Sequence, residues 1–257
     1  MLHSLPHLYK ATVINRPSKT IKSPYVADIK LEDGTIALCH TPGLGCCGLV
    51  STGRTIFVSK AANALAKTAY TAQISESQDS EGTYYVGIHP MESQKVAGQL
   101  LGQITSQPLV WKSEVTVNTH TRLDYVGTNT DGRKTYVEVK NAMIGLEHQA
   151  VLRNKRRAIF PEGYRKSLTD TISPRAVKHA ETLAELVKLP DTEAAYLMFI
   201  VPRSDCLEGL ELNHLDPIYC KAVTLAMVAG VKVRVYSVDF NIDGSIKFHK
   251  RLNFYIP

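Results

Sequence analysis

Two carboxylates and a lysine in the middle of the chain have the residue types of a metal-dependent phosphodiesterase site. Asp124 lies in one segment of alternating polar and apolar residues, and Glu138 and Lys140 lie in the next. Because strand side chains alternate between two faces, Glu138 and Lys140 share a face. Paired carboxylates repel each other unless a cation lies between them, and Mg²⁺ binds one or two carboxylates plus a substrate phosphate. The trio therefore predicts a Mg²⁺ or Mn²⁺ site for phosphodiester hydrolysis, in which Lys140 steadies the attacking water or the charge on phosphorus.

The turn between the two strands decides whether the carboxylates meet. Residues 129–133 read Asn-Thr-Asp-Gly-Arg, a strong turn signal because Asn and Gly accept positive φ. Positions 124 and 138 are symmetric about Asp131, so an odd-length loop centred there sets Asp124 opposite Glu138. A two-residue Asp-Gly loop would instead pair Asp124 with Val139 and separate the carboxylates. We predict the odd loop.

The same alternation predicts which side chains share a face of the sheet. Leu123 and Tyr125 should face one side, as should Val137 and Val139, which leaves the trio on the other. The alternative interpretation of the Glu-Val-Lys tripeptide at 138–140 is an exposed surface ion pair, which is common on strand faces. Asp124 on the adjacent strand favours the metal site over that alternative.

The elements around the trio indicate an α/β chain with two regions. Before residue 90, short strands and turns favour a small barrel, either an OB-fold or an SH3-like barrel. From Met91, hydrophobic periodicity predicts a helix, three strands, a helix, a strand, and a further helix and strand. Helix, three strands, helix, strand is the core order of PD-(D/E)XK nucleases. We expect an OB-like barrel in residues 1–89 and a mixed-sheet, nuclease-like domain in residues 90–257.

Caps and prolines set the predicted boundaries. Ser173-Pro174 begins one helix and Pro190 ends it, while Asp216-Pro217 begins the last helix and Gly230 ends it. Another helix is predicted over residues 91–104. Strands are predicted at residues 55–59, 68–74, 83–88, 109–118, 122–128, 135–141, 195–201, 231–238 and 246–256.

A basic run lies in a long connection between residues 145 and 170. Its cations are Arg153, Lys155, Arg156, Arg157, Arg165 and Lys166. The run is either a flap over a phosphate backbone, which binds without sequence choice and with a salt-sensitive Kd, or a solvated charge run. The helix after Ser173 adds Arg175, Lys178 and His179 in its N-terminal half, where backbone N–H groups favour a phosphate. His179 is alternatively a packed or hydrogen-bonded residue.

The chain resembles the sugar fermentation stimulation protein A (SfsA) family over nearly its whole length. The segments that resemble the family are Arg16-Pro17, residues 40–45, Arg122-Leu123-Asp124-Tyr125, Glu138-Val139-Lys140-Asn141, Phe160-Pro161-Glu162, Lys178-His179, and residues 199–205 and 230–233. The resemblance implies an OB-like barrel joined to a PD-(D/E)XK nuclease-like domain, and DNA binding without sequence preference.

The resemblance also implies roles for particular residues. Asp124, Glu138 and Lys140 fall on the nuclease motif, and Glu114 falls where the family has another acidic residue. The predicted metal ligands are thus Asp124, Glu138, the carbonyl of Val139 and, as an outer ligand, Glu114. The predicted nucleic-acid-binding residues are Arg122, Arg153, Lys155, Arg156, Arg157, Arg175, Lys178 and His179.

The composition is that of an ordinary globular protein with a positive net charge. The 257 residues are 44% hydrophobic and 21% charged, with a net charge of +6. This charge is compatible with a polyanionic partner. The five cysteines form no Cys-x-x-Cys pair, which favours a reducing compartment without a zinc site or a disulfide framework. Because no signal peptide or membrane span is recognisable, we expect an intracellular protein of the cytoplasm or nucleus, with no membrane partner.

Three functions remain open at this point. The first is a metal-dependent nuclease, and the second is a non-catalytic DNA-binding regulatory factor on a nuclease-like fold. The third is a role on RNA, because OB-folds bind both nucleic acids, although we favour DNA. The absence of a nucleotide fingerprint makes a small-molecule enzyme the least favoured class.

Overall fold

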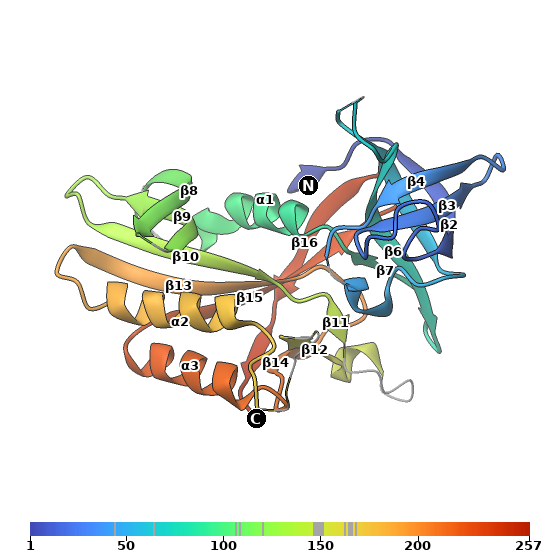
Figure 1. Cartoon of the computed structure of the whole chain (residues 1–257). Helices are drawn as coiled ribbons and strands as arrows, with labels where there is room; N and C mark the ends of the chain where they lie inside the picture. Colours follow the sequence, from blue (N-terminus) through green and yellow to red (C-terminus); the bar gives the residue numbers. More distant parts are fainter. Residues whose placement is uncertain are drawn as a thin grey trace.

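The N-terminal part of the chain forms a small barrel. The computed structural model describes residues 1–257 except 44, 64, 106, 108, 120, 146–151, 162, 164–166 and 168. The barrel strands are β2 (Leu8–Asn15), β3 (Val26–Leu31), β4 (Ile36–His40), β5 (Thr55–Lys60), β6 (Tyr70–Asp79) and β7 (Gly82–Gly87), with the 3₁₀ turn η1 (Gly45–Gly48) before β5. Their order is β4-β3-β2-β5-β6-β7, and a parallel pairing of β4 with β6 closes a ring (Figure 1). This closed ring is the predicted OB-like architecture.

A second, larger sheet crosses the middle of the molecule. Its strands are β1 (His3–Ser4), β8 (Val110–Asn118), β9 (Thr121–Thr128), β10 (Lys134–Asn141), β13 (Thr192–Val201), β15 (Lys232–Phe240) and β16 (Ser245–Arg251). They lie in the order β1-β16-β15-β13-β10-β9-β8. β10, β13 and β15 are parallel, whereas β8, β9 and β16 pair antiparallel with their neighbours. The sheet is therefore mixed, as expected.

Helices cover both faces of this sheet. α1 (Pro90–Leu100), followed by η2 (Leu101–Gln103), lies on one face, and α2 (Pro174–Leu186) and α3 (Pro217–Val228) lie on the other (Figure 1). The central strand β13 is buried on both sides: Leu197 and Phe199 pack in the core under α2 and α3, while Met198 and Ile200 pack in the core that α1 shares with the barrel. Its unbroken apolar sequence is the consequence of this double burial.

The predicted starts of α2 and α3 are confirmed by cap contacts, whereas α2 ends at Leu186, before Pro190, and the helix predicted over 91–104 ends at Leu100 and continues as the 3₁₀ turn η2. The Ser173 hydroxyl accepts a hydrogen bond from the N–H of Ala176, and the Asp216 carboxylate accepts one from Tyr219. Gly230 follows α3 with φ of +111°. The chain order α1, β8, β9, β10, α2, β13 matches the predicted core order, with the unpredicted short strands of a third sheet inserted between β10 and α2. Of the helices in the described residues, none is both long and apolar enough to cross a membrane.

A third, small sheet corrects the expectation of a long connection at residues 145–170. Its strands are β11 (Ile144–Gly145), β12 (Arg157–Phe160), β14 (Gly209–Leu212) and β17 (Asn253–Tyr255), and η3 (Arg153–Lys155) precedes β12. The sequence pattern missed these strands because each is short and pairs with a distant segment. A similar long-range pairing joins β1 to β16, so the first residues of the chain contact the second sheet rather than the barrel sheet.

Candidate active site

The register of β9 and β10 brings the two predicted carboxylates close together. Tyr125 pairs with Val137 and Val126 with Tyr136, so the pairs are symmetric about Asp131 as predicted. The paired positions end there, and Asp124 and Glu138 directly follow the last pair, near enough for the charge of Glu138 to act on Asp124. The intervening loop has the predicted odd length. The Asn129 side chain stabilises it by accepting hydrogen bonds from the N–H groups of Asp131 at 3.0 Å and Arg133 at 2.9 Å.

The strand pair is distorted beside Asp124, and one predicted orientation is therefore wrong. Leu123 packs in the core under α2, whereas Tyr125 packs toward α1, although both were expected on one side. Between the paired positions on β8, Glu114 has a φ of 55°, which is uncommon for a residue with a side chain. The Asp124 carboxylate accepts the N–H of Val139 at 2.7 Å. This bond fixes the carboxylate against the β10 backbone.

Glu138 lies in the most enclosed part of the site. The residue is 3% exposed. Its Oε1 accepts a hydrogen bond from the Lys140 ammonium at 2.6 Å and contacts Nδ1 of His179 on α2. The Lys140 nitrogen also lies 3.2 Å from the same His179 nitrogen. Glu138 Oε2 is buried and has no hydrogen-bond partner among the described residues. A buried carboxylate oxygen without a partner is costly, and a bound cation would satisfy it.

The two carboxyl groups differ in their electrostatics. Burial, followed by the charge of Glu138, raises the pKa of Asp124 to about 7. Burial also acts to raise the pKa of Glu138, but His179 and Lys140 outweigh it and hold that pKa below its ordinary value. Without a cation, Glu138 is thus the ionised partner at neutral pH, while Asp124 is close to its titration midpoint. A divalent cation between them would favour the ionised form of both.

The remaining predicted ligands are placed differently from the pair. Both carboxylate oxygens of Glu114 are engaged, one by the side-chain amide of Gln94 and the other by Arg122 at 2.6 Å. Glu114 is nevertheless close enough to contribute to the raised pKa of Asp124. Across the part of the chain that the structure describes, three or more His, Cys, Asp or Glu side chains do not gather in a metal-binding group.

Three of the six cations of the basic run are paired with carboxylates in the described part of the chain, which corrects the alternative of a solvated charge run for these three residues. Arg153 pairs with Asp79 at 2.8 Å, and Arg156 pairs with Asp79 at 2.9 Å and with Asp205 at 2.6 Å. Arg157 pairs with Glu208 and Glu211, and its guanidinium lies over the Tyr255 ring. Arg122 likewise pairs with Glu114. These guanidinium groups therefore form ion pairs within the protein itself, without a bound phosphate.

The other predicted phosphate-binding residues lie in two different environments. Lys155, Arg175 and Lys178 are exposed. His179 is 4% exposed and lies inside the site against Glu138 and Lys140, where it accepts a weak hydrogen bond from Arg175 at 3.4 Å. Arg165 and Lys166, as well as Leu44 and Glu162 in the family-like segments, lie outside the described residues.

Tyr219 of α3 is a neighbour of Glu138 that the sequence did not reveal. Its ring is fully buried between α3 and the sheet, and its hydroxyl has no hydrogen-bond partner among the described residues. Burial, followed by the charge of Glu138, raises its pKa well above the ordinary value. Only the packing of α3 against the sheet brings Tyr219 close to Glu138. Helical periodicity alone could predict that Tyr219 is buried, but not which residue it contacts.

Comparisons with known proteins agree with this architecture. The profile of the family described as "Sugar fermentation stimulation protein RE domain" matches residues 93–244. A sugar fermentation stimulation protein homolog of Trichormus variabilis is 32% identical over 252 residues, covering 95% of this chain and 94% of the relative. One from Desulfotalea psychrophila is 28% identical over 220 residues, covering 84% of each. The structure of Pyrococcus furiosus SfsA in complex with Ca²⁺ matches with a TM-score of 0.75 at 20% identity, covering 98% of both chains.

Proposed function

Because the chain belongs to the sugar fermentation stimulation protein family, we propose that it binds DNA without strong sequence preference and hydrolyses phosphodiester bonds at Asp124, Glu138 and Lys140. The observation that supports this proposal most is the buried carboxylate pair. Glu138 has an oxygen without a partner among the described residues, and Asp124 has a pKa raised to about 7. Such a pair is costly alone and is stabilised by a divalent cation.

The proposed cofactor is Mg²⁺ or Mn²⁺. Asp124 and Glu138 would hold it, with the Val139 carbonyl as a third ligand and Glu114 as an outer one. When bound, such a cation polarises a phosphate and makes a coordinated water more acidic. A Pyrococcus furiosus relative of the same fold has been solved in complex with Ca²⁺, which supports a divalent cation in this family. Hard divalent cations prefer oxygen ligands of the kind this pair offers.

The protein groups around the pair have distinct tasks in this proposal. The N–H of Val139 orients the Asp124 carboxylate at 2.7 Å. Glu138 Oε1 and His179 hold the Lys140 ammonium within 2.6 Å and 3.2 Å. A fixed ammonium beside a phosphate stabilises the negative charge that develops in the transition state, because it needs no reorganisation when the reaction occurs. Lys140 is thus the proposed electrostatic catalyst.

Nucleic acid is the proposed substrate class, and DNA is favoured over RNA. The net charge of +6 suits a polyanion, and Lys155 and Arg175 are exposed cations. The closed barrel has the architecture of OB-folds, which bind single strands. Contacts from exposed cations go to phosphates and carry no base information, which supports binding without sequence preference.

A second candidate is a non-catalytic DNA-binding regulatory factor on the same fold. One observation favours it: Lys140 and His179 both engage Glu138 Oε1, so part of the carboxylate charge is already compensated without a metal. This candidate predicts salt-sensitive binding that needs no Mg²⁺. Competition among single-stranded DNA, duplex DNA and RNA tests the strand preference of either candidate.

The deciding experiment incubates plasmid DNA and labelled single-stranded DNA with the protein in Mg²⁺, Mn²⁺ or EDTA. We expect metal-dependent cleavage by the wild type and none by Glu138→Ala, which removes a ligand and leaves the fold intact. Glu185→Ala, a change of the same type at an exposed position of α2, is the matched control and should cleave normally. Equal cleavage by Glu138→Ala would overturn the assignment of the centre, and binding without cleavage in every condition would favour the regulatory factor.

A further inference from the structure

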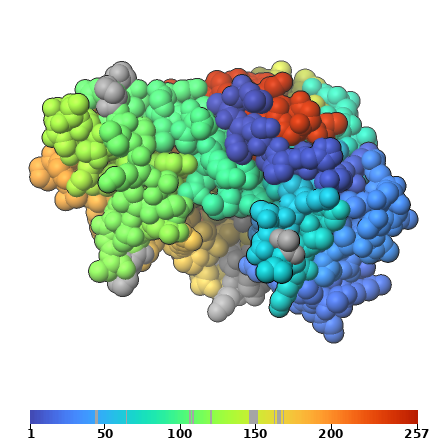
Figure 2. All heavy atoms as spheres, turned by 90° about the horizontal axis from the view of Figure 1, so that it is seen from above, coloured from blue at the N-terminus to red at the C-terminus, as the bar shows by residue number. Residues whose placement is uncertain are grey.

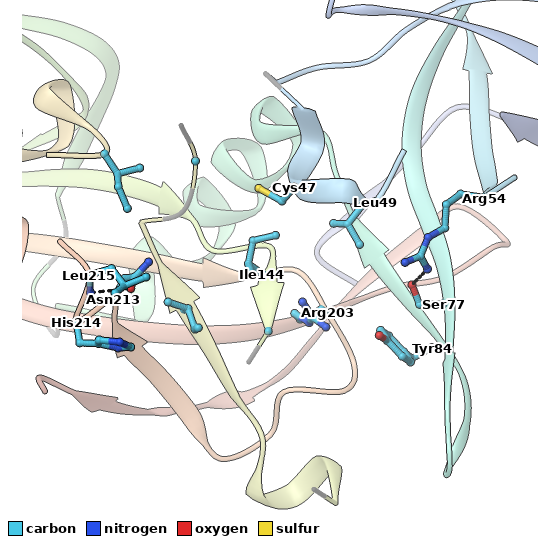
Figure 3. A pocket seen from close by; sticks show the side chains of 14 residues that line it. Cys47, Leu49, Arg54, Ser77, Tyr84, Ile144, Arg203, Asn213, His214 and Leu215 are labelled. Carbon is cyan, nitrogen blue, oxygen red and sulfur yellow. Dashed lines mark hydrogen bonds between the residues drawn. The ribbon is translucent and has the colours of Figure 1, made fainter. Parts of the chain in front are cut away.

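A cavity lies between the barrel and the larger domain, apart from the carboxylate pair. Its volume is about 540 Å³, within the range of small-molecule sites. The barrel side contributes Leu49, Arg54 and Tyr84, and the other side contributes Ile144, Arg203 and His214 (Figure 3). The walls are thus part apolar, part aromatic and part cationic. None of the described residues that line the cavity is acidic.

Some of the chain segments that line the cavity directly follow strands of the second sheet, including β10, which carries Glu138 and Lys140. Ile144 begins β11 just after β10 ends at Asn141, and Arg203 follows the end of β13 at Val201. Ile172, which also lines the cavity, precedes the N-cap of α2. In open α/β sheets, ligands bind in crevices beyond the carboxyl ends of parallel strands. The cavity therefore lies beyond the carboxyl end of β10, the strand that carries Glu138 and Lys140.

Its two arginines offer different chemistry. The guanidinium of Arg203 is held by Asp205 at 2.6 and 2.8 Å and by the Met143 carbonyl at 2.8 Å, and it lies 5.7 Å from the ring of Tyr84. Its charge is compensated and the residue is only 4% exposed, so it orders the cavity wall beside Tyr84 rather than offering a free cation. Arg54 donates a hydrogen bond to the Ser77 hydroxyl at 3.2 Å, and within the described part of the chain no carboxylate forms an ion pair with it (Figure 3).

We propose that this cavity accepts an unpaired nucleotide of the DNA strand bound at the carboxylate pair, an inference that rests on the proposed function. The base packs against Tyr84 and the apolar wall, and the adjoining phosphate pairs with Arg54. A lone phosphate would not use the apolar wall, and an uncharged ligand would not use Arg54. Bases stack on aromatic rings and guanidinium planes whatever their identity, so this site adds a preference for unpaired ends without sequence choice.

The first test measures binding in EDTA, where cleavage does not occur, by fluorescence anisotropy. The probes are a DNA hairpin with a blunt end and the same hairpin with a short single-stranded overhang. We expect the wild type to bind the overhang about tenfold more tightly, the size of one stacked base with its phosphate contact. Arg54→Ala and Tyr84→Leu should abolish this preference and leave blunt-end binding nearly unchanged, whereas Tyr84→Phe should retain it.

Matched controls change the same residue types outside the cavity. Lys30→Ala removes an exposed cation of the barrel and Tyr25→Leu an exposed ring, and both should keep the tenfold preference. Equal affinity of the wild type for both hairpins, or a retained preference in Arg54→Ala, would overturn the cavity assignment. Failure to bind either hairpin would instead contradict the proposed function, so the two failures are distinguishable.

A second measurement does not depend on the stability of the variants. Cys47 is half-buried and lines the cavity, and Cys39, Cys46 and Cys206 are buried. In a Cys220→Ser background, the alkylation of Cys47 by N-ethylmaleimide can be followed by mass spectrometry. We expect the overhang hairpin to slow alkylation severalfold and the blunt hairpin not to. Protection by free deoxyadenosine monophosphate but not by the overhang would refute a strand-bound nucleotide, as would equal rates with both hairpins.

Discussion

At the scale of single residues, Asp124 is the carboxylate that depends most on a cation. Its pKa is raised to about 7 from 3.8, so the folded protein holds a proton that the unfolded chain releases near pH 4. The free energy of unfolding of the metal-free protein should therefore fall as the pH rises from about 4 to about 7. In Asp124→Asn this fall should be smaller, because an amide oxygen can still accept the Val139 N–H and carries no charge.

The same variant should lose its response to metal. A divalent cation at 100 times its Kd stabilises a protein by about 2.7 kcal/mol, which we expect for the wild type in Mg²⁺ and not for Asp124→Asn. Thermal melts in EDTA and in Mg²⁺ at several pH values measure both effects. Asp131→Asn, in the exposed turn, is the control and should behave as the wild type. Equal Mg²⁺ stabilisation of Asp124→Asn would remove this residue from the ligand set.

His179 is the residue whose environment differs most from that of a surface phosphate contact. It is buried against Glu138 and Lys140, and we therefore propose that it positions these two side chains. We expect His179→Ala to lower Mg²⁺-dependent cleavage by about 10- to 100-fold, the usual cost of losing a group that orients a metal ligand. DNA affinity in EDTA should change less than twofold. Reduced affinity with normal cleavage would return His179 to the phosphate-binding set.

At the scale of elements, a buried network of arginines and aspartates joins the barrel to the larger domain. Asp79 at the end of β6 pairs with Arg153 and Arg156, and Asp205 pairs with Arg156 and Arg203. Backbone bonds reinforce the junction, since the N–H of Gly87 donates to the Pro202 carbonyl at 2.7 Å. The cations that the sequence assigned to DNA thus hold together the two halves that flank the cavity.

This network predicts a strong stability effect. Asp205→Ala removes the carboxylate that Arg203 and Arg156 share, so that Arg203 is left buried with only a carbonyl partner while Arg156 keeps Asp79; the loss should cost about 3–5 kcal/mol in denaturant unfolding. Asp191→Ala breaks an exposed pair with Lys134 and should cost less than about 1 kcal/mol. A small loss in Asp205→Ala would show that the junction does not depend on these pairs.

The network also predicts loss of stability in acid. Hydrogen bonds from Arg153 hold the pKa of Asp79 below its ordinary range, and Arg203 and Arg156 outweigh burial to lower that of Asp205. A carboxyl with a depressed folded pKa contributes stability above its unfolded pKa of about 4 and loses it as the pH falls further. The pH dependence of unfolding below pH 4 should therefore be shallower in a doubly substituted Asp79→Asn, Asp205→Asn protein than in the wild type.

At the scale of the whole molecule, the arrangement suits a nucleic acid that passes between two projecting parts. Seen from above, the light-green atoms around β8 and β9 and the blue and cyan barrel project on either side of a notch, with gold atoms of α2 visible between them (Figure 2). α2 presents Arg175 at its exposed N-terminal turn. The barrel, α2 and the carboxylate pair can then contact one strand together.

Salt dependence separates the exposed cations from the structural ones. Each phosphate contact adds about 0.9 to the slope of log K against log salt for duplex DNA. Arg175→Ala and Lys155→Ala should each lower the slope by about one contact and leave thermal stability unchanged. Arg156→Ala should lower the melting temperature. For the protein that remains folded, the slope of log K against log salt should be unchanged. Anisotropy titrations at several salt concentrations give the slopes, and unchanged slopes in both surface variants would place the DNA elsewhere.

The local chemistry of the chain was predictable where it depends on near neighbours. The turn at 129–133 has the predicted odd length and sets a register symmetric about Asp131, which brings Asp124 and Glu138 together, and the caps at Ser173 and Asp216 begin their helices as predicted. The orientation of Leu123 was not predictable, because the distortion at Glu114 arises where two strands meet. The small third sheet was missed because its strands are two to four residues long and pair across the chain.

The sequence by itself determined the order of the longer helices and strands, the register of β9 with β10 and membership of the SfsA family. Each depends on periodicity, turn residues or motifs that act over a few positions. Only the tertiary structure decided which charges are free. Arg153 meets Asp79 across 74 residues, Arg156 meets Asp205 across 49, and His179 meets Glu138 across 41. Such pairings form only when separate elements pack together. For this reason Arg153 and Arg156, which the sequence pattern assigned to a phosphate-binding flap, instead form ion pairs between the barrel and the larger domain.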